Sequence, residues 1–374
     1  MVKGCVESHQ PVILEINQER QFIIKAVPGK KITINKFTFP SEQIIDHPFG
    51  AWFEVFDGIA KRIPSPDCES HDMKNTKYQV KEGEEPLTME KLEELKASGV
   101  DGKEILRQII NSSVNYENKT SFSQCKWISR LEKKYLTRFQ VKRITPRLLC
   151  NYMKYSARIK PALILEEDML SWLIQMVGNS KKVLVHDETA SLLSASLAWR
   201  VGEHGQIVSD TLGGGKQLRE VLIDLDLIRK GSGEAQRNNC PACYTLALSS
   251  LLESTPASLS EDFKKRVESQ NLDTVIEDEW LADCLVIATK YHPTPLLKLM
   301  MKFTRPGATI VIMTPSLRPL EDVCAEMTES GTFTFIRAGE LLYKPWQVKP
   351  ESSHPAMSFN ASSGYALVGY STCE

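Results

Sequence analysis

The sequence lacks the features of a membrane or secreted protein. It has no run of eighteen apolar residues, which is about the length that a helix needs to cross a bilayer. The first ten residues, MVKGCVESHQ, contain no apolar signal segment. With 374 residues, 42% of them hydrophobic and 25% charged, the composition is that of a soluble globular protein of two or three domains.

Cysteine usage argues against a disulfide framework and against a metal site. The nine cysteines, an odd number, are scattered through the chain, which is typical of a reducing compartment. Cys240 and Cys243 form the one close pair, and no further ligands follow at the spacing of a zinc site. We therefore expect no bound metal.

Acidic residues are almost absent between Lys119 and Lys160, where Glu132 stands beside twelve basic residues. This segment carries +11, and because the whole chain carries −1 the remainder carries −12. Aromatic residues such as Trp127 and Tyr135 are interleaved. Basic side chains neutralise phosphates and aromatic rings stack on unpaired bases, so the segment predicts binding of RNA or DNA. The alternative is a solvated helix face with its rings in the core.

The chain upstream of this segment divides into a β-rich part and a helical part. Residues 1–85 contain short strand-like runs separated by turn residues, and we expect a small antiparallel β-barrel there. The runs are Pro11 to Ile16, Gln21 to Ala26, Lys31 to Ile34 and Ala51 to Val55. We expect residues 86–160 to form a helical and basic RNA-binding connector. Its first helix is predicted to follow an N-cap at Thr88 and to end at Gly99, and its second to start at Asp101 with Glu104 completing a capping box.

Residues 161–374 alternate buried strands with helices, which predicts a doubly wound, Rossmann-like α/β domain similar to the S-adenosylmethionine-dependent methyltransferases. The expected strands are Lys181 to His186, Gln206 to Val208, Cys284 to Ala288 and Gly307 to Thr314, with a final hairpin of Thr332 to Arg337 and Tyr365 to Tyr370. The expected helices are Thr189 to Arg200, Gln217 to Ile228, Pro295 to Phe303 and Leu320 to Glu329. Residues 229–278 are predicted to be an insertion with one helix, Asp262 to Glu268.

Glycine is missing from the first strand–helix turn of this domain, His186 to Ser191. Nucleotide-binding versions of the turn contain glycines so that the backbone can approach the cofactor. Here every residue has a Cβ, and Asp187 and Glu188 place carboxylates where a cofactor would need space. Asp210 stands at the position of a ribose-binding acid. We therefore expect that cofactor binding has been lost, although His186 itself could be a satisfied core histidine.

Glycine does occur in the next turn, as Gly213-Gly214-Gly215. This loop follows the second strand rather than the first, and it lacks the Lys-Ser/Thr ending of a P-loop. We interpret it as a site of close chain packing rather than of phosphate binding.

Four ordered motifs resemble the subunits of the eukaryotic tRNA adenine-58 N1-methyltransferases. KFTFP at 36–40 with DHPFG at 46–50 is similar to their N-terminal barrel. KTSFSQCKW at 119–127 with KKY at 133–135 resembles the signature of the non-catalytic subunit, and YHPTPLL at 291–297 resembles a second segment of it. WQV at 346–348, SHP at 353–355 and GY at 364–365 resemble its C-terminal edge.

The resemblance implies a non-catalytic, tRNA-binding subunit, a nuclear protein that pairs with a catalytic paralogue in a heterodimer assembling to a heterotetramer. The paralogue would bind S-adenosylmethionine, and this chain would bind no cofactor. The catalytic subunit has an aspartate after its fourth strand, but the matching residues 288–293 here, ATKYHP, contain no carboxylate. We therefore assign no catalytic, cofactor-binding or metal-binding residue. The candidate RNA-binding residues are Lys119, Thr120, Ser121, Phe122, Ser123, Gln124, Lys126, Trp127, Arg130, Lys133, Lys134, Tyr135, Arg158, Lys160, Lys290 and His292.

Two other functions stay open at this stage. One is an active S-adenosylmethionine-dependent RNA methyltransferase with an atypical cofactor turn, and the other is an RNA-binding scaffold independent of methylation. His292 also has a structural alternative, because a residue between a strand and Pro293 can serve in capping or packing.

Overall fold

The structure is a computed structural model that describes residues 4–16, 20–34, 37–56, 58–65, 102–111, 113, 124, 127–128, 131–132, 136–155, 161–211, 214–230, 235–269, 275–348, 353–355, 357 and 361–372. The chain divides into two compact units, Met1–Ile144 and Thr145–Glu374. The domain boundaries predicted after residues 85 and 160 lie outside the described residues.

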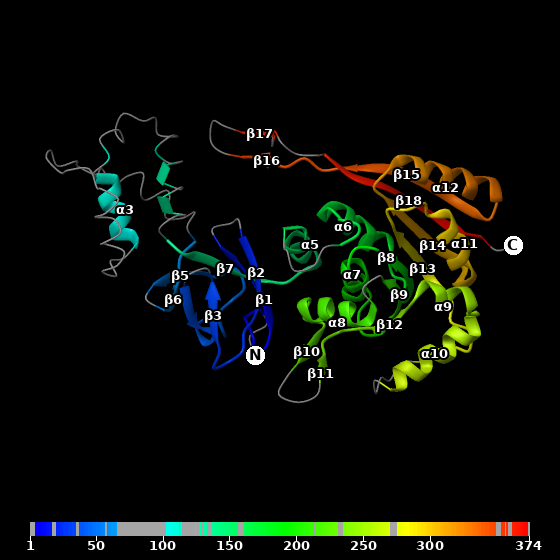
Figure 1. Cartoon of the computed structure of the whole chain (residues 1–374), viewed down its shortest axis with the longest axis horizontal. Helices are drawn as coiled ribbons and strands as arrows, with labels where there is room; N and C mark the ends of the chain where they lie inside the picture. Colours follow the sequence, from blue (N-terminus) through cyan, green and yellow to red (C-terminus); the bar gives the residue numbers. More distant parts are fainter. Residues whose placement is uncertain are drawn as a thin grey trace. The chain divides into compact units, whose positions relative to one another are not determined.

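The first unit is built on a five-stranded antiparallel sheet in the order β2-β1-β7-β5-β6 (Figure 1). Its strands are β1 (Pro11–Ile16), β2 (Arg20–Lys25), β5 (Trp52–Phe56), β6 (Ile59–Ile63) and β7 (Arg138–Arg143), and the hairpin β3 (Lys31–Ile34) and β4 (Phe37–Pro40) pairs separately before the short helix η1 (Ser41–Gln43). Phe39, Phe53 and Phe139 stack in the shared core. The four predicted strands are confirmed. A closed barrel is not confirmed, because the strands that the structure describes form an open sheet.

The basic segment contributes β7 to the middle of this sheet, where sequence reasoning placed only a connector. Phe139 and Val141 point into the core, while Gln140 and Lys142 alternate with them. The predicted second helix is confirmed as α3 (Gly102–Asn111). The helix predicted between Thr88 and Gly99 lies outside the described residues.

The second unit contains a seven-stranded sheet in the order β12-β9-β8-β13-β14-β18-β15. Its strands are β8 (Lys182–Asp187), β9 (Gln206–Thr211), β12 (Ala242–Leu246), β13 (Ala282–Ala288), β14 (Thr304–Thr314), β15 (Phe333–Leu342) and β18 (Ser362–Ser371). The first five strands in this order are parallel, and β18 is antiparallel to both of its neighbours. Numbered along the chain, the parallel part has the doubly wound order 3-2-1-4-5, which places a topological switch point between β8 and β13.

Helices cover both faces of this sheet (Figure 1). One face packs against α9 (Leu248–Glu253), α10 (Pro256–Glu268), α11 (Thr294–Met300) with η2 (Met301–Phe303), and α12 (Leu317–Ser330), in a core that includes Phe263, Trp280 and Phe303. The other face packs against α6 (Glu167–Met176), α7 (Leu192–Val201) and α8 (Gly214–Asp224), with α5 (Pro146–Tyr155) beside α6. Two small hairpins complete the unit: β10 (Ile228–Lys230) with β11 (Ala235–Arg237), and β16 (Trp346–Gln347) with β17 (His354–Pro355). None of the helices in the described ranges has the length and apolarity to span a bilayer.

The prediction that residues 229–278 are an insertion was wrong. β12 is the edge strand of the main sheet, and α9 and α10 form the crossover from β12 to β13. The sequence of β12, ACYTL, lacks a long apolar run because an edge strand is half-covered, unlike the fully buried strands at the centre of a parallel sheet. The helix predicted to reach Ile228 ends at Asp224, since Ile228 begins β10.

Candidate functional site

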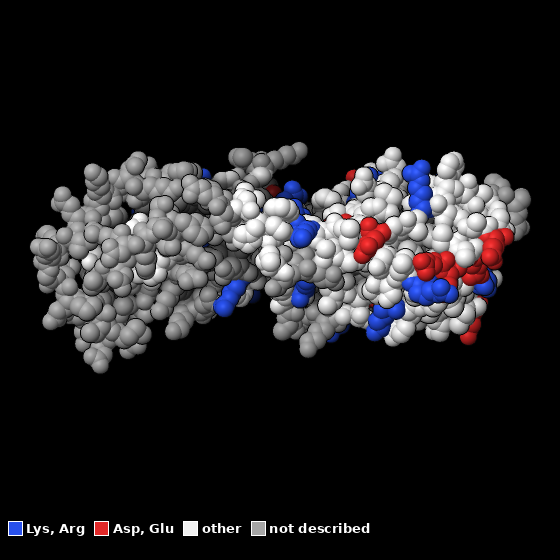
Figure 2. All heavy atoms as spheres, turned by 90° about the horizontal axis from the view of Figure 1, so that it is seen from above, with Lys and Arg blue, Asp and Glu red and all other residues white. Residues whose placement is uncertain are grey.

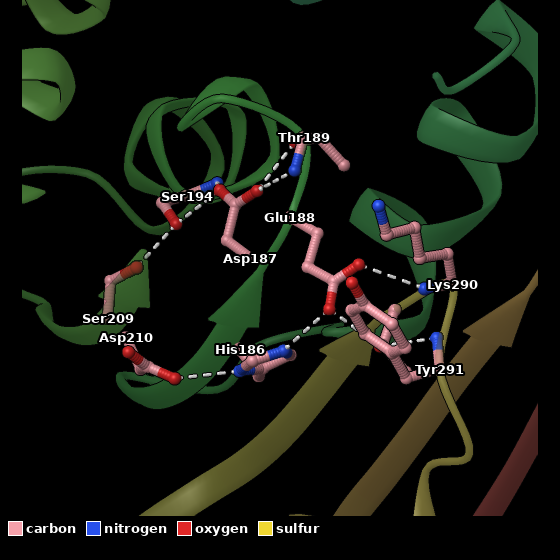
Figure 3. Close-up of polar contacts among 10 residues, drawn as sticks. His186, Asp187, Glu188, Thr189, Ser194, Ser209, Asp210, Lys290 and Tyr291 are labelled. Carbon is pink, nitrogen blue, oxygen red and sulfur yellow. Dashed lines mark hydrogen bonds and ion pairs between the residues drawn. The ribbon is translucent and has the colours of Figure 1, made fainter. Parts of the chain in front are cut away.

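The candidate site is the turn from β8 to α7, at the carboxyl end of the first parallel strand (Figure 3). Five of its six residues, from His186 to Ser191, are polar, and all five are buried, His186 being the most exposed at 5%. Buried polar groups are costly unless they form hydrogen bonds. The partners of these side chains therefore decide what the turn can do.

Asp187 caps helix α7. Its Oδ1 accepts hydrogen bonds from the backbone N and the hydroxyl of Thr189 at 2.7 and 2.6 Å, and its Oδ2 accepts from the backbone N and the hydroxyl of Ser194 at 2.8 and 2.6 Å. The Thr189 hydroxyl oxygen in turn accepts from the backbone N of Leu193 at 3.0 Å. The first N–H groups of a helix have no partner within the helix. Asp187 and Thr189 supply two of these partners, so both act as structural capping groups.

The backbone of the turn has the conformation that glycine prefers, although no glycine is present. Ala190 and Ser191 have φ values of 58° and 66°, in the left-handed region. This conformation costs an L-residue about 1–2 kcal/mol, because Cβ crowds the following carbonyl. The chain therefore keeps the shape of a tight strand–helix turn while it carries side chains there.

Glu188 spans the switch point between β8 and β13. Its Oε1 accepts a hydrogen bond from the Thr289 hydroxyl at 2.8 Å, and its Oε2 accepts from the backbone N of Lys290 at 3.0 Å. Ligands of doubly wound folds bind in the crevice outside the strand ends at this point. Glu188 thus forms hydrogen bonds to residues 289 and 290. These belong to the segment 288–293, which lacks the carboxylate that a catalytic subunit would have there.

His186 joins Glu188 to Asp210 at the end of β9. Its Nδ1 lies 2.7 Å from Asp210 Oδ2, and its Nε2 lies 3.4 Å from Glu188 Oε1. Burial disfavours the charged imidazole, but the hydrogen bond and charge of Asp210, and then those of Glu188, outweigh it and raise the pKa of His186. The interpretation of His186 as a satisfied core histidine is confirmed. The acid at the ribose-binding position is bound by this histidine.

These residues do not fit S-adenosylmethionine. A cofactor in this fold needs close approach to the backbone of the first turn and an acid available to its ribose. Here the turn is filled by side chains that bind one another. In the part of the chain that the structure describes, no buried side-chain nitrogen or oxygen lacks a hydrogen-bond partner, so the polar atoms of this turn are already satisfied.

Sequence reasoning missed three hydroxyl residues that complete this network: Ser194, Ser209 and Thr289. The Ser194 hydroxyl donates to Asp187, so the Ser209 hydroxyl, 2.6 Å away, donates to Ser194. The signal was present in the sequence, because these hydroxyl residues interrupt or directly follow otherwise apolar stretches of α7, β9 and β13.

Four of the sixteen predicted RNA-binding residues belong to the described part of the chain. Gln124 and Trp127 are half-buried in the first unit, and Lys290 and His292 follow β13 in the second. Lys290 is exposed and its Nζ lies 5.1 Å from the centre of the Tyr291 ring. His292 Nδ1 accepts a hydrogen bond from Thr294 N at 3.4 Å, which agrees with the alternative capping role. The other twelve, Lys119, Thr120, Ser121, Phe122, Ser123, Lys126, Arg130, Lys133, Lys134, Tyr135, Arg158 and Lys160, lie outside the described residues.

The described cations of the basic segment are largely neutralised within the protein. Four of the five form ion pairs: Arg138 with Glu54 and Glu132, Lys142 with Glu15, Arg147 with Glu167, and Lys154 with Glu166. Arg143, the fifth, is exposed. Figure 2 shows basic and acidic side chains interspersed on one face of the second unit, with acidic ones gathered toward the end that carries α12. The charge counted along the sequence therefore overstates what residues 138–154 offer to a polyanion.

The close cysteine pair forms no recognisable metal site. Across the described ranges, no group of three or more histidine, cysteine, aspartate or glutamate side chains could hold a metal ion. The Cys243 thiol donates to the backbone oxygen of Pro241 at 3.6 Å.

Comparisons with solved structures show the fold. An S-adenosylmethionine-dependent O-methyltransferase from Thermotoga maritima superposes with a TM-score of 0.57 at 11% identity, covering 100% of this chain and 97% of the other. The tRNA (m1A58) methyltransferase TrmI from Aquifex aeolicus superposes with a TM-score of 0.52 at 11% identity, covering 99% of this chain and 100% of the other. The predicted Rossmann-like methyltransferase fold is confirmed.

Comparisons of sequence agree with the resemblance that the motifs indicated. The tRNA (adenine(58)-N(1))-methyltransferase non-catalytic subunit TRM6 of Mus musculus is 24% identical, over 98% of this chain and 88% of the relative. The subunit of the same name from Schizosaccharomyces pombe is 23% identical, over 98% of this chain and 92% of the relative. The model of the Gcd10p family matches residues 5–223, more than half of the sequence. The chain therefore belongs to the Gcd10p family.

Proposed function

We propose that this chain is the non-catalytic, tRNA-binding subunit of a tRNA adenine-58 N1-methyltransferase complex. It works in the nucleus with a catalytic paralogue that binds S-adenosylmethionine, and the two assemble as a heterotetramer. The observation that carries the proposal is the β8–α7 turn, in which Asp187, Glu188 and Asp210 are bound by neighbouring groups of the same chain. Relatives that match nearly the whole sequence are named non-catalytic subunits.

The proposed division of labour follows from the energetics of the reaction. The partner supplies S-adenosylmethionine and the reacting carboxylate, and this chain supplies contacts to the tRNA. The target adenine is stacked inside folded tRNA, so exposing it costs a few kcal/mol. Additional contacts between basic side chains and the RNA backbone offset that cost.

The alternative of an active enzyme with an atypical turn would require the buried network to open. Glu188 would have to release Thr289 and Lys290, and Asp210 would have to release His186. Removing one partner from a buried ion pair costs about 3–5 kcal/mol, because the remaining charge is left uncompensated. Residues 288–293 would still provide no carboxylate.

Exposed apolar side chains support the need for a protein partner. Phe335, Leu342, Trp346, Val348 and Met357, on β15 and the segment that follows it, are between 61% and 86% exposed. Four of the five lie within residues 342–357, and exposed apolar side chains that gather on a surface mark interaction sites. We therefore expect the isolated chain to self-associate and the assembled complex to stay in solution as one species, which light scattering measures directly.

The deciding experiment compares this chain, the catalytic paralogue and their complex. Calorimetry should detect no S-adenosylmethionine binding to this chain alone, and methylation at adenine 58 should require both subunits. Binding to the isolated chain at micromolar affinity and one-to-one stoichiometry would favour the active-enzyme alternative. Full methylation and tRNA binding by the paralogue alone would favour a scaffold independent of methylation.

The RNA-binding role of the KKY motif has its own test in the assembled complex. Changing Lys133 and Lys134 together to Ala should weaken tRNA binding and lower the slope of log affinity against log salt by roughly one per lost phosphate contact. The matched control changes Lys61 and Arg62, two adjacent exposed cations on β6, and should leave the slope unchanged. Trp127→Ala should remove about 1–3 kcal/mol of stacking if a base lies on this ring, with little effect on the slope.

A further inference from the structure

A pocket of about 670 Å³ lies in the second unit, beside the edge strand β12. It is lined by residues of helix α8, by Cys243 and Thr245 of β12, and by Arg266 of α10. This volume is within the range of pockets that hold small organic ligands. The pocket is separate from the buried network at the end of β8, since none of its lining residues belongs to that network.

The charged side chains that line this pocket have one sign. Lys216 and Arg219 of α8 and Arg266 of α10 line it, and no acid is among the described residues that do so. All three cations are exposed. Cations elsewhere in the unit commonly have acidic partners, such as Arg229 with Asp226, whereas these three form no ion pair within the described ranges.

Lys216 lies on the first turn of α8, Arg219 lies on the next turn, and Arg266 comes close to the first turn from α10. The Arg266 guanidinium lies over the Tyr244 ring, 5.6 Å from its centre, which restrains the side chain and leaves its N–H groups available. A Cβ added at Gly215 would lie 4.0 Å from Arg266 Nη2 and 2.8 Å from Thr245 Oγ1. Glycine at 215 therefore allows α8 to approach β12 closely, which supports the packing interpretation of this loop and brings cations from two helices together.

The three exposed cations form the rim of this pocket, and most of the other lining residues are apolar. Leu218 and Leu222 of α8 line it, together with Ile228 and Pro241. A ligand that satisfies both parts has an anionic group for the rim and a flat or apolar group for the interior. A nucleotide has both, in its phosphate and in its sugar and base. Base faces are compatible with apolar surfaces, and phosphates are bound by lysine and arginine.

We propose that this pocket binds a phosphate-bearing nucleotide of the tRNA, with Lys216, Arg219 and Arg266 contacting the backbone phosphates. The proposal rests on the proposed function, because it takes tRNA as the polyanion held by the complex. It adds a contact made by residues of the second unit that are not part of the basic segment of residues 119–160. A free nucleotide offers the same chemistry, so the experiment has to separate the two sources.

The test uses the assembled complex and labelled tRNA over a series of salt concentrations. Changing Lys216 and Arg219 together to Ala should weaken tRNA binding roughly tenfold and lower the salt slope by about one to two units. The matched control changes Arg200 and Lys302 to Ala. These are two exposed cations of the same unit that do not line the pocket, and the control should leave both quantities unchanged. Thermal melting should be the same for all three complexes, since every changed side chain is exposed.

The outcomes separate this inference from the function on which it rests. If the original complex methylates tRNA but the pocket variant keeps its affinity and salt slope, the pocket does not hold tRNA and only this inference is wrong. If the original complex neither binds nor methylates tRNA, the proposed function itself is wrong. Titration with adenosine 5′-monophosphate identifies the other source. Binding that is lost in the pocket variant, while tRNA affinity is retained, would assign the pocket to free nucleotides and overturn the proposal.

Discussion

Replacing Asp187 by Ala tests whether the β8–α7 turn serves structure rather than chemistry. The substitution removes an acceptor of four hydrogen bonds, two from backbone N–H groups and two from hydroxyls. A buried donor without a partner costs about 1–3 kcal/mol, and the hydroxyls of Thr189 and Ser194 can rotate toward other acceptors at lower cost. We expect α7 to lose about 4 kcal/mol of stability. Asp187→Asn, which keeps one acceptor, should lose about half of that.

Hydrogen exchange in the assembled complex measures this loss directly. The chain has two units, so a single unfolding transition is not a safe measure of one helix. The opening free energy of the amides of Leu192–Val201 reports α7 itself. Asp278→Ala is the matched control, because it removes an aspartate whose side chain is fully exposed and, among the described residues, forms an ion pair with Lys264 alone. It should leave the exchange of α7 unchanged.

The decisive comparison is between stability and activity. Folded complex that contains Asp187→Ala should methylate saturating tRNA at an unchanged rate, because the proposed function assigns the reacting groups to the partner. A variant that keeps the exchange protection of α7 but loses methylation or S-adenosylmethionine binding would refute the reasoning. Asp187 would then act in the reaction rather than as a helix cap.

Three further predictions concern side chains placed by the structure. The pKa of His186 is raised in the folded protein above its unfolded value. Its charge therefore stabilises the fold below about pH 6.5, and this contribution is lost as pH rises through the folded pKa. The difference in Tm between the original complex and the His186→Gln complex should narrow from acid to alkaline pH, and a difference that widens would contradict the assignment. Arg138→Ala should destabilise the first unit by about 3–5 kcal/mol because it removes the 2.8 Å ion pair to the largely buried carboxylate of Glu54. Arg138→Met with Glu54→Leu should recover most of this loss in denaturant unfolding. Ala190→Gly should leave the stability of the fold unchanged or raise it by up to about 1 kcal/mol. Glycine relieves the strain of the left-handed φ, but it also increases the conformational entropy of the unfolded chain. A clear loss of exchange protection in α7 would show that the Ala190 methyl group contributes packing that outweighs the backbone strain.

The sequence alone determined the features that depend on neighbouring residues. The apolar run at 183–185 predicts a buried strand because burial on both faces requires apolar side chains at successive positions. The absence of glycine from His186 to Ser191 predicts a filled turn, since each residue adds a Cβ at a fixed place. The capping residues near Asp101 predicted the start of α3. Each of these inferences uses contacts within one or two turns of chain.

Only the tertiary structure decided how distant polar groups pair. Glu188 and Thr289 are 101 residues apart in sequence, and Arg138 and Glu54 are 84 residues apart. Periodicity reports whether a side chain is buried, but the identity of its partner depends on which strands become neighbours in the sheet. For the same reason, β12 fell within a segment predicted to be an insertion, although it forms the edge strand of the sheet. Cations counted toward an RNA-binding surface proved to be paired with acids from other elements.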